Sequence, residues 1–140
     1  MSFAVRFAAQ SISLRTDRIS PVDAERQERT AADILKRLEK QPGVILADEV
    51  GMGKTFVALA TAASVALARP DGGPVVVMVP PSLKQKWPKD WEVFRQHCLR
   101  GEPASQLLTP GQLLLSETTC QPPTSKLYQR RPAGAARAPQ

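Results

Sequence analysis

The part of this sequence with the clearest chemical potential is a glycine-rich turn followed by a lysine and a hydroxyl residue. The stretch LADEVGMGKT contains, in order, Gly51, Gly53, Lys54 and Thr55. Glycines let backbone N–H groups converge on an anion, the lysine can reach β- and γ-phosphates, and the threonine hydroxyl can coordinate Mg²⁺. The stretch therefore predicts a phosphate-binding loop. One departure stands out, because the general Gly-x4-Gly-Lys-[Ser/Thr] pattern has glycine where this chain has Asp48.

A phosphate loop needs a strand before it and a helix behind it, because the N-terminus of a helix favours an anion. Residues 44–47, VILA, are a short apolar run typical of a strand buried in a parallel sheet. Residues 54–68 are alanine-rich and apolar nearly all round, which predicts a buried helix. This strand–loop–helix order favours a nucleotide site over a structural turn.

The flanking segments extend the same pattern. Residues 21–40 begin with proline at a plausible first helical position and carry an apolar stripe at helical spacing, and Gln41-Pro42-Gly43 ends that helix. The stripe consists of Ala31, Ile34, Leu35 and Leu38. Residues 75–79, VVVMV, predict a second buried strand. Strand, helix and strand form a βαβ unit, so the predicted class is α/β with a parallel sheet.

Two segments are less clear. After the second strand, the chain predicts a short helix or turn from Ser82 and then a helix from Trp87 or Pro88. Residues 1–20 are ambiguous, although FAVRFA could form a short strand.

LADEVGMGKT resembles the nucleotide-binding motif of the Swi/Snf-type ATPases, a branch of the superfamily 2 helicases. Their loop typically reads Asp-Glu-Met/Val-Gly-Leu/Met-Gly-Lys-Thr, so Asp48 stands where that family has aspartate. The resemblance implies a partial RecA-like P-loop domain over residues 21–100, with ATP and Mg²⁺ as cofactors. It implies that Thr55 holds Mg²⁺ through its hydroxyl and that the nucleotide is bound by Asp48, Glu49, Gly51, Met52, Gly53, Lys54 and Thr55.

Upstream of the loop, Gln27 looks like the glutamine by which these ATPases recognise adenine. A glutamine amide can pair with the N6 and N7 edge of adenine through two hydrogen bonds. Gln27 falls on the same helical stripe as Ala31 and Leu38, facing inward, where an unpaired amide would be costly. A solvated helix glutamine is the alternative.

Downstream, VVVMVPPSLKQKWPKDWE is similar to the family's next motif, in which a strand leads to a tryptophan-containing helix beside the DNA backbone. Ser82, Lys84 and Lys86 could then contact phosphates of double-stranded DNA. The alternative is a capping serine with two solvated lysines. Trp87 and Trp91 are four residues apart and favour core packing over base stacking.

The family's hydrolytic machinery has no counterpart in this sequence. A Swi/Snf-type motor has two RecA-like lobes and a second acidic motif on another strand, whereas Asp48-Glu49 belongs to the loop itself and is the only Asp-Glu pair in the chain. The catalytic residues are therefore unknown, and whether the chain is an enzyme stays open. We expect this chain to be the front part of such a motor, in which the reading frame stops or shifts near residue 105. A small self-contained P-loop module and a poorly folded remnant are the alternatives.

Composition limits the other possibilities. Residues 121–140 carry four basic groups and no acid, so most of the net charge of +6 lies in these twenty residues. We expect the tail from residue 101 onward to be disordered. A basic tail alone is weak support for nucleic-acid binding. Cys98 and Cys120 do not form a metal or disulfide motif. No apolar run is long enough for a signal or a membrane span, so we expect a cytoplasmic protein.

Overall fold

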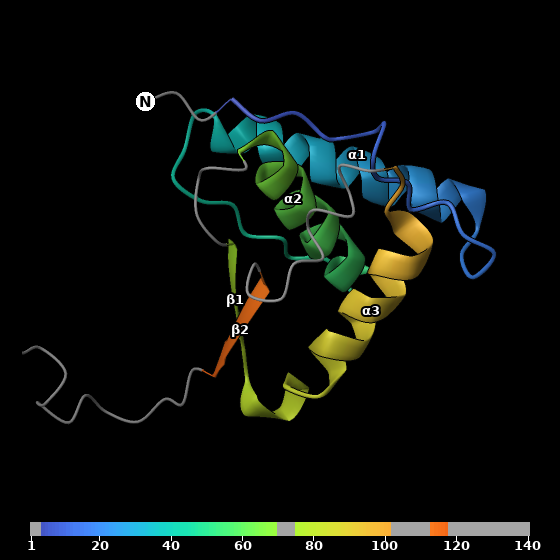
Figure 1. Cartoon of the computed structure of the whole chain (residues 1–140). Coiled ribbons are helices and arrows are strands. Elements are labelled where there is room, and N and C mark those ends of the chain that lie inside the picture. Colours follow the sequence, from blue (N-terminus) through green and yellow to red (C-terminus); the bar gives the residue numbers. More distant parts are fainter. Residues whose placement is uncertain (1–3, 70–74, 102–112, 118–140) are drawn as a thin grey trace, which may run out of the picture.

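Three α-helices and a two-stranded parallel sheet make up the described part of the chain (Figure 1). The structure is a computed structural model, and it describes residues 4–69, 75–101 and 113–117. The elements follow in the order α1 (Pro21–Leu38), α2 (Lys54–Ala68), β1 (Val75–Val79), the 3-10 turn η1 (Pro81–Leu83), α3 (Lys86–Cys98) and β2 (Leu113–Glu117).

Helix α1 begins where the sequence predicts. Ser20 caps it, because its hydroxyl oxygen accepts a hydrogen bond from the backbone N–H of Asp23 at 3.1 Å, and Pro21 occupies the first turn. The helix buries the inward stripe of Ala24, Gln27, Ala31 and Leu35, while Ile34 and Leu38 are only half-buried. The inward orientation predicted for Gln27 is confirmed.

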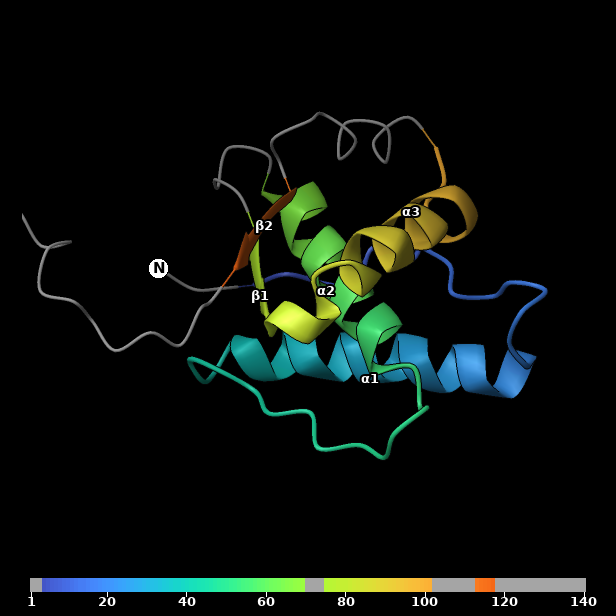
Figure 2. The ribbon, with the colours of Figure 1, turned by 90° about the horizontal axis from the view of Figure 1, so that it is seen from below.

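Helix α2 has the predicted bounds and lies at the centre of the molecule, between α1 on one side and α3 with β1 on the other (Figures 1 and 2). Its buried residues are mostly small, namely Val57, Leu59, Ala60, Ala63 and Ser64. Small side chains let neighbouring helices approach closely, and α2 is apolar nearly all round because it has neighbours on both sides.

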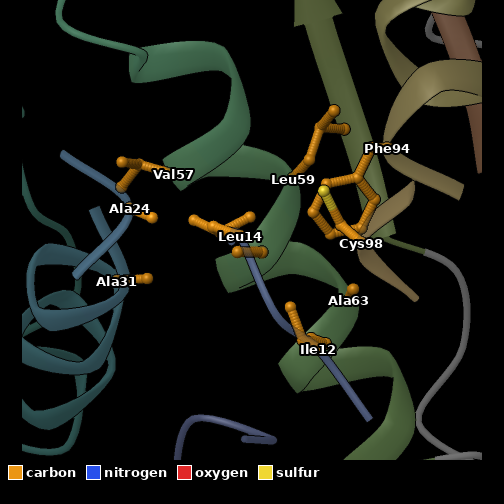
Figure 3. Packing of buried hydrophobic residues seen from close by; sticks show 10 residues of the cluster. Ile12, Leu14, Ala24, Ala31, Val57, Leu59, Ala63, Phe94 and Cys98 are labelled. Atoms are coloured by element: carbon orange, nitrogen blue, oxygen red, sulfur yellow. The ribbon is translucent and has the colours of Figure 1, made fainter. Parts of the chain in front are cut away.

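The apolar core joins all three helices to the N-terminal segment. Figure 3 shows Phe94 and Cys98 of α3 beside Leu59 of α2, with Leu14 on the side of α2 that faces α1. The rings of Trp91 and Phe94 stack with centroids 5.8 Å apart, and Trp87 also packs against this cluster. The predicted packing role of the two tryptophans is confirmed.

The segment before α1 is irregular and is part of the same core. FAVRFA forms no strand over its described residues 4–8, yet Val5, Ile12 and Leu14 are buried. The segment is held to the end of α3 by a single antiparallel bridge between Ile12 and Leu99, where the Ser13 N–H donates to the Cys98 carbonyl at 2.8 Å. Residues from Val5 onward therefore stabilise the helical layer without regular structure of their own.

The parallel sheet lies elsewhere than predicted. β1 pairs with β2 in parallel, from Val75 opposite Leu113 to Val79 opposite Glu117, and α3 lies between the two strands in the chain. The predicted strand at 44–47 is wrong, because these residues are irregular and Ile45 is 93% exposed. A strand requires a neighbour for its backbone N–H and C=O groups, and no described strand pairs with this segment.

The tail that we expected to be disordered from residue 101 onward contains the strand β2 (Leu113–Glu117), and the expectation of disorder otherwise stays a prediction. Three consecutive leucines there are in register with the valines of β1, and an apolar run of this kind suits a strand in a parallel sheet. The remaining tail, residues 102–112 and 118–140, lies outside the described residues.

Candidate nucleotide-binding site

The phosphate loop predicted from the sequence leads directly into α2. Gly51 and Gly53 have φ angles of +86° and +79°, in the left-handed region that glycine adopts most readily. Gly53 is the N-cap of α2 and makes no side-chain capping bond. The first N–H groups of a helix have no partners within it, and its dipole is positive at that end. The junction is therefore suited to an anion.

Lys54, the first residue of α2, folds back over the loop. Its ammonium nitrogen donates to the carbonyl oxygens of Asp48 at 2.7 Å and of Glu49 at 2.5 Å. The side chain is half-buried. A positive charge is thus held against the loop backbone, where a phosphate bound at the start of α2 would meet it. Thr55 is the next residue and is also half-buried.

Gln27 of α1 reaches the same junction. A Cβ atom placed on Gly53 would lie only 2.6 Å from Cδ of Gln27, so the amide occupies the space that a side chain would need. Gln27 is 5% exposed, and its Oε1 is buried with no hydrogen-bond partner. Such an atom is costly to bury, and an adenine amino group is a donor that would satisfy it.

Arg26 of α1 contacts the loop, and the sequence did not predict this contact. Its guanidinium donates from one terminal nitrogen to Oδ2 of Asp48 at 3.3 Å and from the other to the Met52 carbonyl at 3.1 Å. The Asp48 carboxylate also accepts from the backbone N–H of Glu49 at 3.1 Å. The aspartate in place of glycine is therefore an ion-pair partner for α1. The pairing crosses 22 positions in the chain, and no local pattern signals it.

These residues fit ATP with Mg²⁺. Positive-φ glycines, a helix N-terminus and Lys54 suit phosphates, and the unpaired Oε1 of Gln27 suits a donor on a base. The described residues contain no group of three His, Cys, Asp or Glu that could hold a metal ion. Mg²⁺ commonly takes few protein ligands and several phosphate oxygens or waters, so a single hydroxyl such as that of Thr55 is compatible with it.

The residues predicted to contact DNA lie on one exposed turn. Ser82 is in η1, Lys84 follows it, and Lys86 begins α3. Lys86 forms an ion pair with Asp90 at 2.5 Å, one turn further along the helix. The structure thus gives Lys86 a partner within α3, and the DNA contacts stay a prediction.

Three groups with shifted pKa values, Glu92, Arg95 and Cys98, lie on α3, away from the loop. Hydrogen bonds from Arg95, at 2.7 and 3.0 Å, and a further one from Gln96 lower the pKa of the half-buried Glu92 carboxyl. Burial, aided by the Glu28 carboxylate, raises the pKa of the Cys98 thiol to about 11. Glu92 and Arg95 form a contact at the surface, and Cys98 is a thiol in the core, so none of them belongs to the candidate site.

Positive-φ glycines at a helix N-terminus and a lysine directly after them are features of P-loop nucleotide-binding proteins, although the described residues before this loop form no strand. Among known families, the SNF2-related domain matches residues 26–116, and the chain therefore belongs to that family, with this region a Swi/Snf-family ATPase region. Neither the curated proteins nor the solved structures gave a match.

The extent of the match corrects one expectation. It includes Gln27, the whole loop and most of β2, so the family's sequence continues past residue 105, where we expected the frame to stop or shift. ATPases of this family use ATP and Mg²⁺ and act on DNA. The described part of the chain has no helix both long and apolar enough to cross a membrane.

Proposed function

We propose that this chain binds ATP·Mg²⁺ as the nucleotide-holding part of a Swi/Snf-like, DNA-dependent ATPase. The observation that carries the proposal is the buried Gln27 amide against Gly53, with an oxygen that has no partner. A base-recognising group next to a phosphate-recognising loop is what an adenine nucleotide requires. Its 5% exposure argues against the alternative of a solvated helix glutamine.

Each residue has a distinct role in this proposal. The N–H groups at the start of α2 and the Lys54 ammonium bind the β- and γ-phosphates. The Gln27 amide pairs with the adenine edge, and the Thr55 hydroxyl is a ligand of Mg²⁺. Gly51 and Met52 shape the loop, while Asp48 and Glu49 hold the Lys54 ammonium through their carbonyls. Bound ATP supplies a triphosphate whose terminal phosphoryl group can be transferred to water.

Hydrolysis requires more than this loop. A phosphoryl-transfer enzyme must orient the attacking water and neutralise charge that develops in the transition state. The chain's only Asp-Glu pair lies in the loop, and the Asp48 carboxylate is already paired with Arg26. We therefore propose that the chain alone holds ATP with little or no turnover.

DNA contact is the less direct part of the proposal. Ser82, Lys84 and Lys86 are exposed on the turn that leads into α3, and two lysines there would suit a phosphate backbone. Because Asp90 pairs with Lys86, the net positive charge that this turn presents to DNA is smaller than that of two solvated lysines. We expect weak, salt-sensitive DNA binding by this chain.

A ligand panel on the full 140-residue chain tests the nucleotide proposal. The ligands are ATP, GTP and inorganic triphosphate, each with Mg²⁺, titrated against the parent and Gln27→Ala. We expect the parent to prefer ATP over GTP. Gln27→Ala should weaken ATP by about tenfold or more, the value of a lost hydrogen-bonding pair, while triphosphate binding changes little.

Gln41→Ala is the matched control, because Gln41 is an exposed glutamine in the turn after α1. Equal affinity of the parent for ATP and GTP would favour a general P-loop module. Equal losses of ATP and triphosphate in Gln27→Ala would mean that Gln27 acts through the fold, and the adenine assignment would be wrong.

A further inference from the structure

Arg26 connects α1 to both ends of the phosphate loop. One terminal nitrogen of its guanidinium bonds to the carboxylate of Asp48, where the loop starts, and the other bonds to the carbonyl of Met52, where it ends. A planar guanidinium can hold two acceptors in fixed positions at once. The side chain is about one-third exposed, so these contacts are partly shielded from solvent.

Asp48 connects Arg26 to Lys54 through two contacts. The carboxylate of Asp48 pairs with Arg26, while the carbonyl of the same residue accepts a hydrogen bond from the Lys54 ammonium at 2.7 Å. A displacement of Asp48 would therefore move an acceptor that holds Lys54. The guanidinium of Arg26, the backbone of Asp48 and the ammonium of Lys54 form one connected chain of contacts.

The charge of Asp48 also needs an explanation. A carboxylate in a phosphate loop would repel a triphosphate if it were unpaired, because like charges at short range destabilise each other. Arg26 places a positive charge 3.3 Å from this carboxylate. The ion pair lets an acid occupy this part of the loop without adding a net negative charge beside the phosphates.

We propose that Arg26 is a positioning residue, which pins the phosphate loop to α1 and neutralises Asp48. This inference deepens the proposed ATP site and rests on it for its effect on affinity, whereas the pinning of the loop does not depend on any nucleotide. Arg26 also stands next to Gln27, so α1 fixes the phosphate loop and the proposed base-recognising amide through consecutive residues.

The first test uses the full-length chain without nucleotide. Hydrogen–deuterium exchange is followed in peptides that cover residues 48–53, in the parent, Arg26→Gln and Arg26→Lys. We expect severalfold faster exchange in Arg26→Gln and an intermediate rate in Arg26→Lys, because a lysine keeps the charge but cannot span both acceptors. Arg29→Gln is the matched control, since Arg29 pairs with Glu25 at 2.9 Å on the exposed side of the same helix.

Far-UV circular dichroism of each variant checks that α1 and α2 remain folded. Unchanged exchange of the loop in a folded Arg26→Gln variant would overturn the pinning role, as would equal acceleration by Arg29→Gln. This test stands even if the parent binds no ATP, a result that would overturn the proposed function instead.

The second test measures ATP·Mg²⁺ affinity in a double-mutant cycle. Arg26→Gln should weaken ATP binding by about tenfold, which is the value of one charged hydrogen bond. The double variant Arg26→Gln, Asp48→Asn should regain most of that lost affinity, because no unpaired carboxylate remains. The effect should also be larger for ATP and inorganic triphosphate than for adenosine, which has no charge to repel. A double variant no tighter than Arg26→Gln, or equal losses for adenosine and ATP, would overturn the neutralising role.

Discussion

Replacing the glycine at the start of α2 gives a quantitative test of the contact between the loop and α1. Gly53 has φ of +79°, and a Cβ atom there would lie 2.6 Å from Cδ and 3.1 Å from Oε1 of Gln27. Gly51 has a similar φ of +86°, but a Cβ atom there would meet nothing within 4 Å. Gly51→Ala therefore reproduces the backbone strain of Gly53→Ala without its steric clash.

The expected costs follow from these geometries. An alanine in the left-handed region costs about 1–2 kcal/mol, and Gly51→Ala should reduce the free energy of unfolding by that amount. Gly53→Ala must also push the buried Gln27 amide out of its position, which adds about 0.5–1.5 kcal/mol for a distorted side chain. Since the amide is the end of a flexible side chain, we expect it to move, with α2 remaining folded.

Urea unfolding followed by circular dichroism measures the free energy of unfolding of these variants, each in the parent and in a Gln27→Ala background. That variant removes all three side-chain atoms that the new Cβ atom would approach. In its background, Gly53→Ala should cost no more than Gly51→Ala does. ATP titrations of the same proteins should show a larger loss for Gly53→Ala than for Gly51→Ala.

Equal destabilisation by the two alanine substitutions would refute this reasoning. The same conclusion would follow if Gln27→Ala left the extra cost of Gly53→Ala unchanged. In either case the Gln27 amide would not lie against the loop, and the strongest support for the proposed adenine contact would be lost.

Two other predictions concern reactivity. Burial raises the pKa of the Cys98 thiol from an ordinary 9.0 to about 11, so the folded state favours the neutral thiol. The part of the free energy of unfolding that comes from this shift should therefore be lost as the pH rises from about 9 to 11. In a Cys120→Ser variant, alkylation at pH 8 should be slower in the folded than in the unfolded chain by about a hundredfold from the smaller thiolate fraction alone; equal rates would contradict the burial of Cys98. ATP turnover by the full-length chain should stay at the level of a no-protein blank with or without double-stranded DNA, because the Asp48 carboxylate is paired with Arg26; DNA-stimulated turnover that Lys54→Ala abolishes would contradict this.

The elements set by local pattern were predictable from the sequence. Helix α2 has the predicted bounds because its alanine-rich composition and the glycines before it act within a few residues. The inward position of Gln27 follows from helical spacing alone, since it shares a face with Ala31. The loop residues Gly51 and Gly53 adopt the left-handed conformation that a phosphate loop requires.

The elements that depend on distant partners were not predictable. Residues 44–47 have the composition of a buried strand, but a strand forms only where a neighbour pairs with it, and β1 pairs instead with β2. The contact of Arg26 with Asp48 joins two segments whose proximity no spacing rule indicates. The N-terminal segment around Ile12 joined the core without regular structure, and no periodicity signals such a segment.

The most direct test of the central claim is isothermal titration of ATP·Mg²⁺ into the parent, Lys54→Ala and Lys89→Ala. Lys54 is held against the loop carbonyls, whereas Lys89 is an exposed lysine on α3 that serves as the control. Loss of the Lys54 ammonium should cost ~2–3 kcal/mol of binding free energy, because a charge-assisted contact to phosphate disappears. We expect measurable binding by the parent and Lys89→Ala, and at least a tenfold loss in Lys54→Ala with an unchanged far-UV spectrum. Equal affinities in all three proteins would contradict the claim that this loop binds the nucleotide.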